Sequence, residues 1–380
     1  MTSKPDVHDP DRSRKLDKYW VPIVARTIDL LDCFASAAQP LSLEEVVRLT
    51  DIPHTTAYRI LHTLVTRDYL NRCGRRYRLN QMRRRLKLGF ANLSRHISLA
   101  VEIEQSLRAA AAGAGVDLLV WDNDRAADLA VQNARQMAAA KVDLAIEFQL
   151  FDNVAPVISD VFLRAEIPLI SLVNPHHGTV YFGVNNYRAG CAAGAALADH
   201  ALRHWKAEID ALLLLESPRA GRSIQSRLIG ALQGVQEKLG PLPEKDVHHL
   251  DGGGEKDASR AAVAAFLGGK TGQRMLVAGI NDESAIGAVE AARQARHGWE
   301  LAIVGHGGSR EIIDLAADPL SPCIGAVNFQ PQRYGPDLLD FALPILRGRS
   351  APVGHYVPHQ FIGKDDLLHP PKNPHAMCEN

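Results

Sequence analysis

From residue 86 onward, short runs of Val, Ile and Leu alternate with longer amphipathic segments, and this alternation restricts the possible fold more than any other feature of the chain. Strands that are apolar on both faces and separated by helices are typical of a parallel sheet covered on both sides. The alternation comes as two series, over about residues 86–184 and 187–305. Two series in tandem predict two α/β lobes, and the facing carboxyl ends of their strands predict a ligand cleft.

The strands predicted from the apolar runs are Leu86–Ala91, Val116–Trp121, Val142–Phe148, Pro168–Val173, Tyr181–Val184, Ile209–Leu215, Val247–Leu250, Met275–Gly279 and Leu301–Gly305. The helices predicted between them are Leu99–Ala114, Ala126–Ala140, Val154–Ala165, Tyr187–Trp205, Ile224–Leu239, Ala258–Leu267 and Ser284–Arg296.

Ahead of the lobes, Leu41–Leu64 predicts two short helices joined by a tight turn. Ser42 can cap the first helix, and Glu45 stands three residues later, where a capping-box partner belongs. Pro53 disfavours the helical conformation at Ile52 and therefore separates the two helices. Apolar residues at helical spacing predict the core of this region, which would include an upstream helix over Ile23–Phe34. The predicted core residues are Ile23, Leu30, Leu31, Phe34, Leu43, Val46, Val47, Leu49, Ala57, Ile60, Leu61 and Leu64.

The outward face of the second helix predicts a DNA contact. Its residues are Thr55, Thr56, Tyr58, Arg59 and His62. Hydroxyl groups can reach phosphates or base edges, and an Arg can bind guanine through two hydrogen bonds in the major groove. The residues that follow predict a β-hairpin with a turn at Cys73-Gly74. This hairpin would be a wing that places four basic side chains near the phosphates, namely Arg72, Arg75, Arg76 and Arg78. A solvated helical hairpin inside a larger bundle is the alternative for the helical pair alone.

These segments together resemble the DNA-binding domain of the IclR family of bacterial transcription regulators. The resemblance rests on ARTIDLLDCFA, PLSLEEVVRLTDIPHTTAYRILHTLVTRDYL and RRYRL, which occur in this order over about residues 21–79. It implies a winged helix-turn-helix that binds double-stranded operator DNA. One departure is His54-Thr55, where the family usually has a Lys-Ser type pair, and this leaves the operator sequence open.

The charge is distributed unevenly along the chain, although the whole chain is formally neutral. Residues 1–87 carry 17 Lys and Arg against 10 Asp and Glu, which leaves 26 basic and 33 acidic residues for the rest of the chain. A basic head on an acidic body suits a protein that binds phosphates at one end only.

The α/β part resembles the type I periplasmic binding protein fold, as found in the sugar-binding domains of LacI-type repressors. The matching segments are DLLVWDND, AVQNARQM, YFGVNNYRAGCAAGAAL, SRLIGALQGV, MLVAGINDESAIGAVEA, ELAIVGHGG and GAVNFQPQRYG. The resemblance covers about residues 86–368 and implies three crossings of the chain between the lobes. It would place residues 86–185 and 305–327 in one lobe, and residues 186–304 and 328–368 in the other.

The resemblance also implies an effector site at the strand ends that face the cleft. The residues expected there are Asn92, Arg95, Asn174, Arg227, Asn281, Asp282, His306 and Asn328. Arg227 matches the family's ligand-gripping arginine, and a guanidinium suits vicinal hydroxyls or a carboxylate. A surface helix arginine is the alternative for Arg227, and capping of the following helix is the alternative for Asp282.

Two departures from the family pattern bear on the ligand. Asn174 and His306 stand where the family usually has Asp, so two carboxylates that would accept hydroxyl protons are replaced by an amide and an imidazole. A simple neutral hexose becomes less favoured as the ligand, and an anionic or amide-bearing ligand becomes plausible. If His306 contacts the ligand, the affinity should change between about pH 5.5 and 7.5 through imidazole titration.

Other classes of function have little support in the sequence. Gly269-Lys270-Thr271 lacks the first glycine of a P-loop, because Ala264 stands in its place. The His176-His177 and His248-His249 pairs do not have the spacing of helical metal ligands, and no GxSxG motif occurs. We therefore expect no enzyme activity, no cofactor and no resident metal.

The sequence also bears on the compartment. The first nineteen residues have no apolar run, and the five cysteines are scattered without a CxxC pair. Both features favour a cytoplasmic protein with reduced thiols and no membrane segment.

The sequence therefore predicts the following organisation: a disordered tail (1–20), a winged helix-turn-helix domain (21–80), a basic linker (81–85) and a two-lobed α/β effector domain (86–370) with two parallel doubly wound sheets. Its predicted function is a bacterial transcription regulator that acts as a homodimer on operator DNA. A small polar effector between the lobes, such as a sugar, sugar acid or polyol, would control DNA binding. The alternative is the solute-binding protein of a sugar uptake system, with no direct role on DNA.

Overall fold

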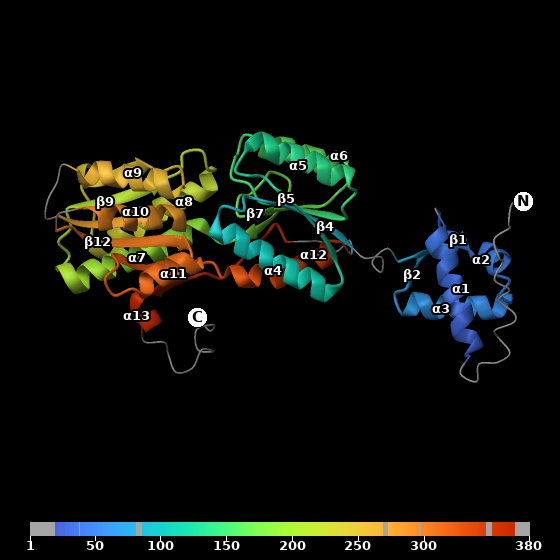
Figure 1. Cartoon of the computed structure of the whole chain (residues 1–380). Coiled ribbons are helices and arrows are strands. Elements are labelled where there is room, and N and C mark those ends of the chain that lie inside the picture. Colours follow the sequence, from blue (N-terminus) through green and yellow to red (C-terminus); the bar gives the residue numbers. More distant parts are fainter. Residues whose placement is uncertain are drawn as a thin grey trace, which may run out of the picture. The chain divides into compact units, whose positions relative to one another are not determined.

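The computed structural model describes residues 20–37, 39–80, 86–268, 273–295, 298–346 and 352–368. The chain divides into two compact units between Arg85 and Leu86 (Figure 1), and each unit is described by itself. The predicted linker and all of the predicted tail except Trp20 lie outside the described residues.

The N-terminal unit consists of three helices and a small three-stranded sheet in the order β1-β3-β2. Its elements are α1 (Pro22–Ser36), β1 (Leu41–Ser42), α2 (Leu43–Thr50), α3 (His54–Thr66), β2 (Leu70–Cys73) and β3 (Arg76–Leu79). The predicted capping box starts α2, because the Glu45 amide donates to Ser42 Oγ (3.3 Å) and the Ser42 amide donates to Glu45 Oε2 (2.7 Å). The wing turn is Gly74-Arg75, one residue later than predicted, with Gly74 at φ +64°.

The core of this unit forms where the helical periodicity predicted it, with two exceptions. Leu30, Phe34 and Val46 are buried, and so is the inward face of α3. Ile23 is 49 % exposed and Leu49 is 61 % exposed, so their assignment to the core is wrong. Both lie at the outer margins of their apolar stripes, where the three small helices cannot enclose them.

The C-terminal unit contains two six-stranded sheets, one in each lobe. The first lobe has the order β14-β8-β7-β6-β4-β5, with all pairs parallel. Its strands are β4 (Lys87–Asn92), β5 (Asp117–Asp122), β6 (Leu144–Glu147), β7 (Leu169–Leu172), β8 (Val180–Gly183) and β14 (Gly354–Tyr356). The second lobe has the order β10-β9-β11-β12-β13-β15, in which only β15 is antiparallel. Its strands are β9 (Ala211–Glu216), β10 (Val247–Asp251), β11 (Arg274–Gly279), β12 (Glu300–Gly307), β13 (Cys323–Asn328) and β15 (Gln360–Gly363).

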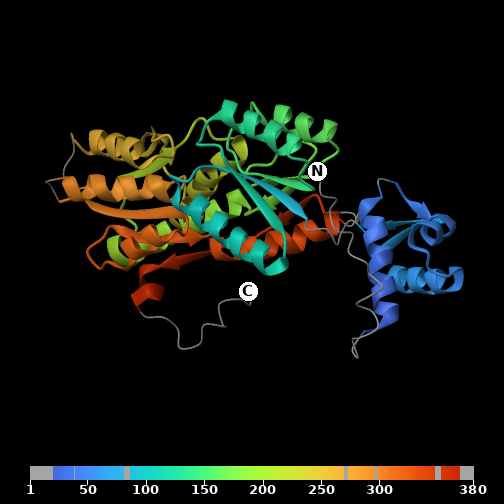
Figure 2. The same ribbon diagram turned by 45° about the vertical axis from the view of Figure 1, so that its right-hand side comes forward.

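Helices cover both faces of each sheet, as the doubly wound pattern predicted. In the first lobe α5 (Ala127–Ala139) and α6 (Ala155–Arg164) lie on one face, and α4 (Ser98–Ala114) and α12 (Tyr334–Leu346) lie on the other (Figures 1 and 2). In the second lobe one face carries α7 and α8, and the other carries α9, α10 and α11. The bounds of these helices are α7 (Asn186–Trp205), α8 (Arg222–Leu239), α9 (Lys256–Leu267), α10 (Asp282–Gln294) and α11 (Arg310–Ala317), followed by the short α13 (Lys364–Leu368).

The chain crosses between the lobes three times, but two of the predicted crossings are misplaced. Residues 305–327 were assigned to the first lobe, whereas β12 and β13 pair with each other in the second lobe from Ile303↔Cys323 to Gly307↔Asn328. The second crossing therefore comes after Asn328, and it takes α12 and β14 into the first lobe. The third crossing returns the chain to β15, which pairs with β13. The edge strands β14 and β15 decide this arrangement, and neither was predicted from the sequence.

Close packing of α7 on α8 fixes the helical layer next to the crossings. A Cβ atom on Gly190 would overlap the Arg227 carbonyl oxygen, and one on Gly194 would overlap the Ala231 carbonyl oxygen. These glycines let the two backbones approach closely enough to hold Arg227 against the first turn of α7.

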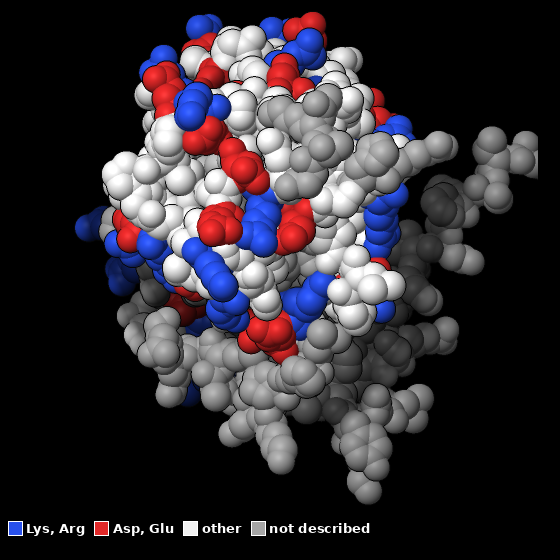
Figure 3. Space-filling model, turned by 90° about the vertical axis from the view of Figure 1, so that its left-hand side faces the viewer, with Lys and Arg blue, Asp and Glu red and all other residues white. Residues whose placement is uncertain are grey.

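Charges of both signs are interspersed on the face of the molecule shown in Figure 3. Ion pairs of the second lobe include Arg274 with Glu208 (2.9 Å) and Glu300 (3.2 Å).

Within the described residues, no helix has the length and apolar character needed to cross a membrane.

Candidate functional site

Helix α3 presents a polar face to solvent. Tyr58, Arg59 and His62 are exposed on it, together with Thr55, while Thr56 is half-buried. The Tyr58 and His62 rings lie 6.4 Å apart. No side chain caps the first turn of α3, so its amide groups remain available to an anion such as a phosphate. All five residues predicted on this helix are thus at least partly accessible, and Thr56 and Arg59 lie on the side that faces α1.

The arginines of the wing differ in how firmly they are held. Arg76 donates from Nη1 to the Pro40 carbonyl (2.8 Å) and pairs with Glu45 Oε2 (3.0 Å), which ties β3 to the start of α2. Arg72 donates from Nε to the Gly74 carbonyl (3.0 Å) across the turn. The side chains of Arg75 and Arg78 are exposed and make no hydrogen bond or ion pair with another described residue. Arg75 and Arg78 are thus the freer cations of the wing.

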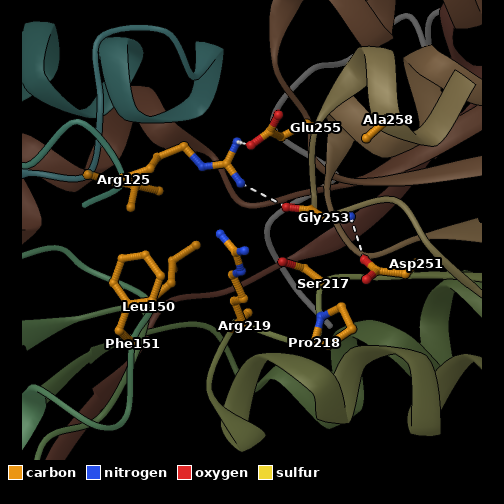
Figure 4. Close-up of a pocket in the computed structure, with 12 residues that line it drawn as sticks. Arg125, Leu150, Phe151, Ser217, Pro218, Arg219, Asp251, Gly253, Glu255 and Ala258 are labelled. Carbon is orange, nitrogen blue, oxygen red and sulfur yellow. Dashed lines mark hydrogen bonds and ion pairs between the residues drawn. The ribbon is translucent and has the colours of Figure 1, made fainter. Parts of the chain in front are cut away.

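A cavity of about 350 Å³ lies between the two lobes (Figure 4). Its lining comes from the segments that follow strands of both sheets, where the doubly wound fold predicts a ligand. The residues from the first lobe are Leu93, Arg125, Leu150 and Phe151, and those from the second are Ser217, Pro218, Arg219, Ala220, Asp251, Gly253, Glu255 and Ala258.

Hydrogen bonds join the lobes on both sides of this cavity. Arg125 donates from Nη2 to the Gly253 carbonyl (2.8 Å), and its Nη1 pairs with Glu255 Oε1 (3.0 Å). The Gly221 amide donates to the Leu150 carbonyl (2.8 Å). The lobes are therefore in contact, and the cavity is bounded by residues of both.

None of the eight residues predicted for the effector site lines this cavity. Two of them are joined inside the first lobe. Asn92 is buried and donates to Glu104 Oε2 (2.9 Å), and Arg95 donates to the same oxygen (3.4 Å). Arg108 pairs with the other carboxylate oxygen of Glu104 (2.7 Å). These contacts support α4 rather than the cavity wall.

Asn174 and Asn281 lie next to residues of the cavity or its margin. Asn174 donates to Asp152 Oδ1 (3.3 Å), and the other oxygen of Asp152 accepts from the amide of Arg222 in the second lobe (3.1 Å). Asn281 caps α10 by accepting from the Ser284 amide (2.9 Å) and donates to the Gly254 carbonyl (2.9 Å), beside the cavity residue Gly253.

Arg227 is buried in the second lobe, which excludes the alternative of a surface helix arginine. Its Nε donates to Asn186 Oδ1 (2.8 Å), its Nη1 donates to the Ile280 carbonyl (3.0 Å), and its guanidinium lies 4.9 Å from the centre of the Phe329 ring. Burial lowers the pKa of Arg227 to about 10. Arg227 thus joins α8 to the start of α7 and the end of β11.

Asp282, His306 and Asn328 are also held by their own lobe. Burial raises the pKa of Asp282 to about 7, and its Oδ2 accepts from the Ser309 amide (2.7 Å). Burial lowers the pKa of His306 to about 3, and its Nδ1 lies 2.7 Å from the Gly279 carbonyl. The expected titration of His306 between pH 5.5 and 7.5 is therefore wrong, because burial keeps the ring neutral. Asn328 accepts from the Gln330 amide (2.8 Å).

Five of the eight predicted residues still have a buried polar atom with no hydrogen-bond partner. These atoms are Asn92 Oδ1, Asn174 Oδ1, Arg227 Nη2, Asp282 Oδ1 and His306 Nε2. Buried polar atoms in proteins are normally paired with protein, water or ligand. These five residues consequently keep the capacity to bind a polar partner.

Sequence reasoning missed the residues that do line the cavity, above all Arg125, Phe151 and Arg219. They follow β5, β6 and β9, so the strand-end rule that selected Asn92 and Asn174 applies to them equally. Applying this rule to the end of every predicted strand would have selected these three residues as well. In the part of the chain that the structure describes, no group of three His, Cys, Asp or Glu residues is placed to hold a metal ion.

The comparisons with known proteins assign both parts of the chain. A family model described as a periplasmic binding protein domain matches residues 88–350. The chain belongs to the periplasmic binding protein family. A model described as an IclR helix-turn-helix domain matches residues 23–74, ahead of the periplasmic binding protein domain. The comparison with curated proteins gave no match.

Solved periplasmic binding proteins share the two-lobed fold. A solute-binding protein from Actinobacillus succinogenes with bound D-allose is 19% identical, with a TM-score of 0.63 over 74% of this chain and 99% of that one. A protein from Mycobacterium smegmatis in complex with β-D-fucofuranose is 19% identical, with a TM-score of 0.65 over 77% and 96%. A glucose-galactose binding protein from Geobacillus stearothermophilus is 22% identical, with a TM-score of 0.62 over 74% and 98%.

Proposed function

We propose that this protein is a transcription regulator whose binding to operator DNA is controlled by a sugar or sugar derivative held between the two lobes. One observation carries the proposal: a helix-turn-helix domain with an accessible polar α3 and a two-lobed periplasmic binding protein domain occur on one chain. The solved proteins of the same fold include complexes with D-allose and β-D-fucofuranose, which supports a sugar-like effector.

Closure of the lobes is the step that would couple the effector to DNA. A ligand that contacts both lobes favours the closed arrangement over an open one, and it shifts the equilibrium by its difference in affinity for the two states. The contacts from Arg125 to Gly253 and Glu255 exist only when the lobes meet. In a homodimer on DNA, such a change would alter the placement of the two helix-turn-helix domains.

The alternative of a solute-binding protein for an uptake system accounts for the lobes but not for the N-terminal domain. A transport protein has no use for an exposed α3 and a wing with two free arginines. Since the function we propose takes place on DNA, we place the protein in the cytoplasm. We assign it no catalytic role.

The test begins with a DNA site selected from a random pool by the full-length protein. Binding of this site is followed by fluorescence anisotropy during titration with sugars, sugar acids and polyols, and at least one compound should change the affinity. Arg59→Ala should weaken DNA binding by about 1–3 kcal/mol if Arg59 contacts a guanine. Arg164→Ala serves as the control, because Arg164 is an exposed arginine on α6 of the first lobe. Equal loss of affinity in both variants, or none in either, would contradict the assignment of α3.

A further inference from the structure

We infer that the effector carries an acidic group, a carboxylate or a phosphate, which binds between Arg219 and Arg125 in the cavity between the lobes. This inference rests on the proposed function and narrows the class of ligand. It concerns residues outside the set that the sequence predicted for the effector site.

Arg219 is a cation without a partner. It follows β9 in the cavity wall, and its guanidinium makes no hydrogen bond or ion pair with any residue that the structure describes. Figure 4 shows its guanidinium directed toward Arg125 and Gly253, and the residue is exposed at the mouth of the cavity. The nearby carboxylates have other partners, since Glu255 pairs with Arg125 (3.0 Å) and Asp251 Oδ1 accepts from the Gly253 amide (2.9 Å).

Arg125 faces Arg219 from the other lobe. Two of its N–H groups are used on Gly253 and Glu255, and a guanidinium has five such donors in a rigid plane. A ligand anion that binds Arg219 and the free donors of Arg125 would join the two lobes, which couples its recognition to closure.

The rest of the cavity suits a small polyhydroxy body. Its volume of about 350 Å³ is at the lower end of the range of small-molecule pockets. Leu150 and Phe151 form an apolar side of the cavity (Figure 4), against which the C–H face of a sugar ring can pack. Ser217 and the carbonyl of Gly253 supply neutral hydrogen-bonding groups on the other side.

The test compares D-glucose, D-gluconate, D-glucose 6-phosphate and inorganic phosphate by isothermal titration calorimetry on the full-length protein. The acidic sugars should bind about 10- to 100-fold more tightly than D-glucose, which is the usual effect of a hydrogen bond to a charged group. Comparing the affinities of D-gluconate and D-glucose 6-phosphate shows whether the site prefers a carboxylate or a phosphate. Arg219→Gln should remove the preference, whereas Arg222→Gln should keep it, because Arg222 is exposed next to the cavity without lining it.

Three results would overturn the inference: D-glucose bound as tightly as the acids, a preference that survives in Arg219→Gln, or no binding of any acid at millimolar concentration. The proposed function fails separately. If a neutral sugar changes the affinity for the selected DNA, the proposed regulatory function holds and the proposed acidic group on the effector is wrong. If the acids bind through Arg219 but leave DNA binding unchanged, the proposed anion site holds and the proposed regulatory function is wrong.

Discussion

Arg227 has a structural role that the sequence did not predict. The arginine was expected to grip the ligand, but in the structure its guanidinium bonds to Asn186 and to the Ile280 carbonyl. Arg227→Ala would leave both acceptors unpaired in the interior. We therefore expect the free energy of unfolding of the lobes to fall by about 2–5 kcal/mol.

Urea denaturation of the parent and of Arg227→Ala measures this loss. Arg227→Lys is the matched variant, since it keeps a charge and one donor but cannot reach both acceptors in the same geometry, and it should lie between the two. If Arg227→Ala is as stable as the parent but no longer binds the effector, Arg227 contacts the ligand directly.

Glu147 at the end of β6 predicts a pH dependence. Burial raises its pKa to about 8, its Oε1 accepts from Asn123 (2.8 Å), and its Oε2 has no partner. Between the ordinary pKa of a Glu and about 8, the folded protein keeps a proton that the unfolded chain has released. Stability should therefore decrease as the pH rises through this window, by up to about 1.4 kcal/mol per pH unit for this group.

Denaturation curves at pH 5, 6, 7 and 8 test this slope. Glu147→Gln keeps an acceptor for Asn123 and has no proton to lose, so its curves should depend less on pH than those of the parent. Asp282 behaves in the same direction up to about pH 7, so the decrease of stability with pH should be smaller in Glu147→Gln and smaller again when Asp282→Asn is added. A parent slope unchanged in the double variant would contradict both assignments.

At the scale of single residues, the sequence predicted the exposed and buried residues of α3 better than the residues that line the cavity. The outward and inward faces of α3 follow from helical periodicity alone, since neighbours three and four apart share a face. The cavity depends on which strand ends meet across the lobes, and Arg125 and Arg219 are 94 positions apart in the chain. Family resemblance pointed to Arg227 and His306, which are buried and bonded within the second lobe and do not line the cavity.

At the scale of elements, strands and helices were predictable wherever their own sequence determines them. The capping box of α2 and the alternation from β4 to β12 are local patterns, and their ends agree with the structure within a few residues. The short β14 and β15 have no such pattern, because pairing with β8 and β13 defines them. The error in the lobe boundaries followed from missing these two edge strands.

Glutamates on α4 and α10 cap helix starts across the two lobes, at α11 and α4, and these contacts predict how closure is stabilised. Glu102 on α4 accepts from the Arg310 amide at the start of α11 (3.1 Å), and Glu283 on α10 accepts from the Ser98 amide at the start of α4 (3.2 Å). Neither α4 nor α11 has a side-chain cap from its own N-cap residue. Each carboxylate also lies favourably at the positive end of a helix dipole.

Glu102→Ala should therefore weaken effector binding by about three- to tenfold, because one helix cap is worth about 1 kcal/mol and the closed state would lose one. Glu102→Gln is the matched control, since its carbonyl can still accept from the amide, and it should keep most of the affinity. Calorimetry gives the affinities, and small-angle scattering should show a larger radius of gyration for Glu102→Ala without ligand. Equal affinities in the two variants would mean that this contact does not hold the lobes together.

At the scale of the whole molecule, the uneven charge separates the tasks of the two units. The balance of basic residues lies in residues 1–87, and the family models place the DNA-binding domain there and the periplasmic binding protein domain after it. The excess of positive charge thus lies at one end of the chain. The acidic excess of the other end disfavours its contact with DNA.

We expect the protein to act on DNA as a homodimer, because one winged helix-turn-helix covers about one half-site and two-fold dimers bind two half-sites about one helical turn or a multiple apart. Joining two such contacts raises the affinity through the effective concentration of the second domain. The full-length protein should therefore bind a two-half-site DNA at least about 100-fold more tightly than a single half-site, and the ratio should fall when the spacing is changed by half a turn.

Residues 1–85 alone lack the α/β unit, which we expect to supply most of the dimer contact, and should bind both DNAs with similar affinity. Sedimentation of the full-length protein as a monomer at micromolar concentration with the two-half-site DNA, together with equal affinity for one and two half-sites, would exclude the dimer and leave each chain to act by itself.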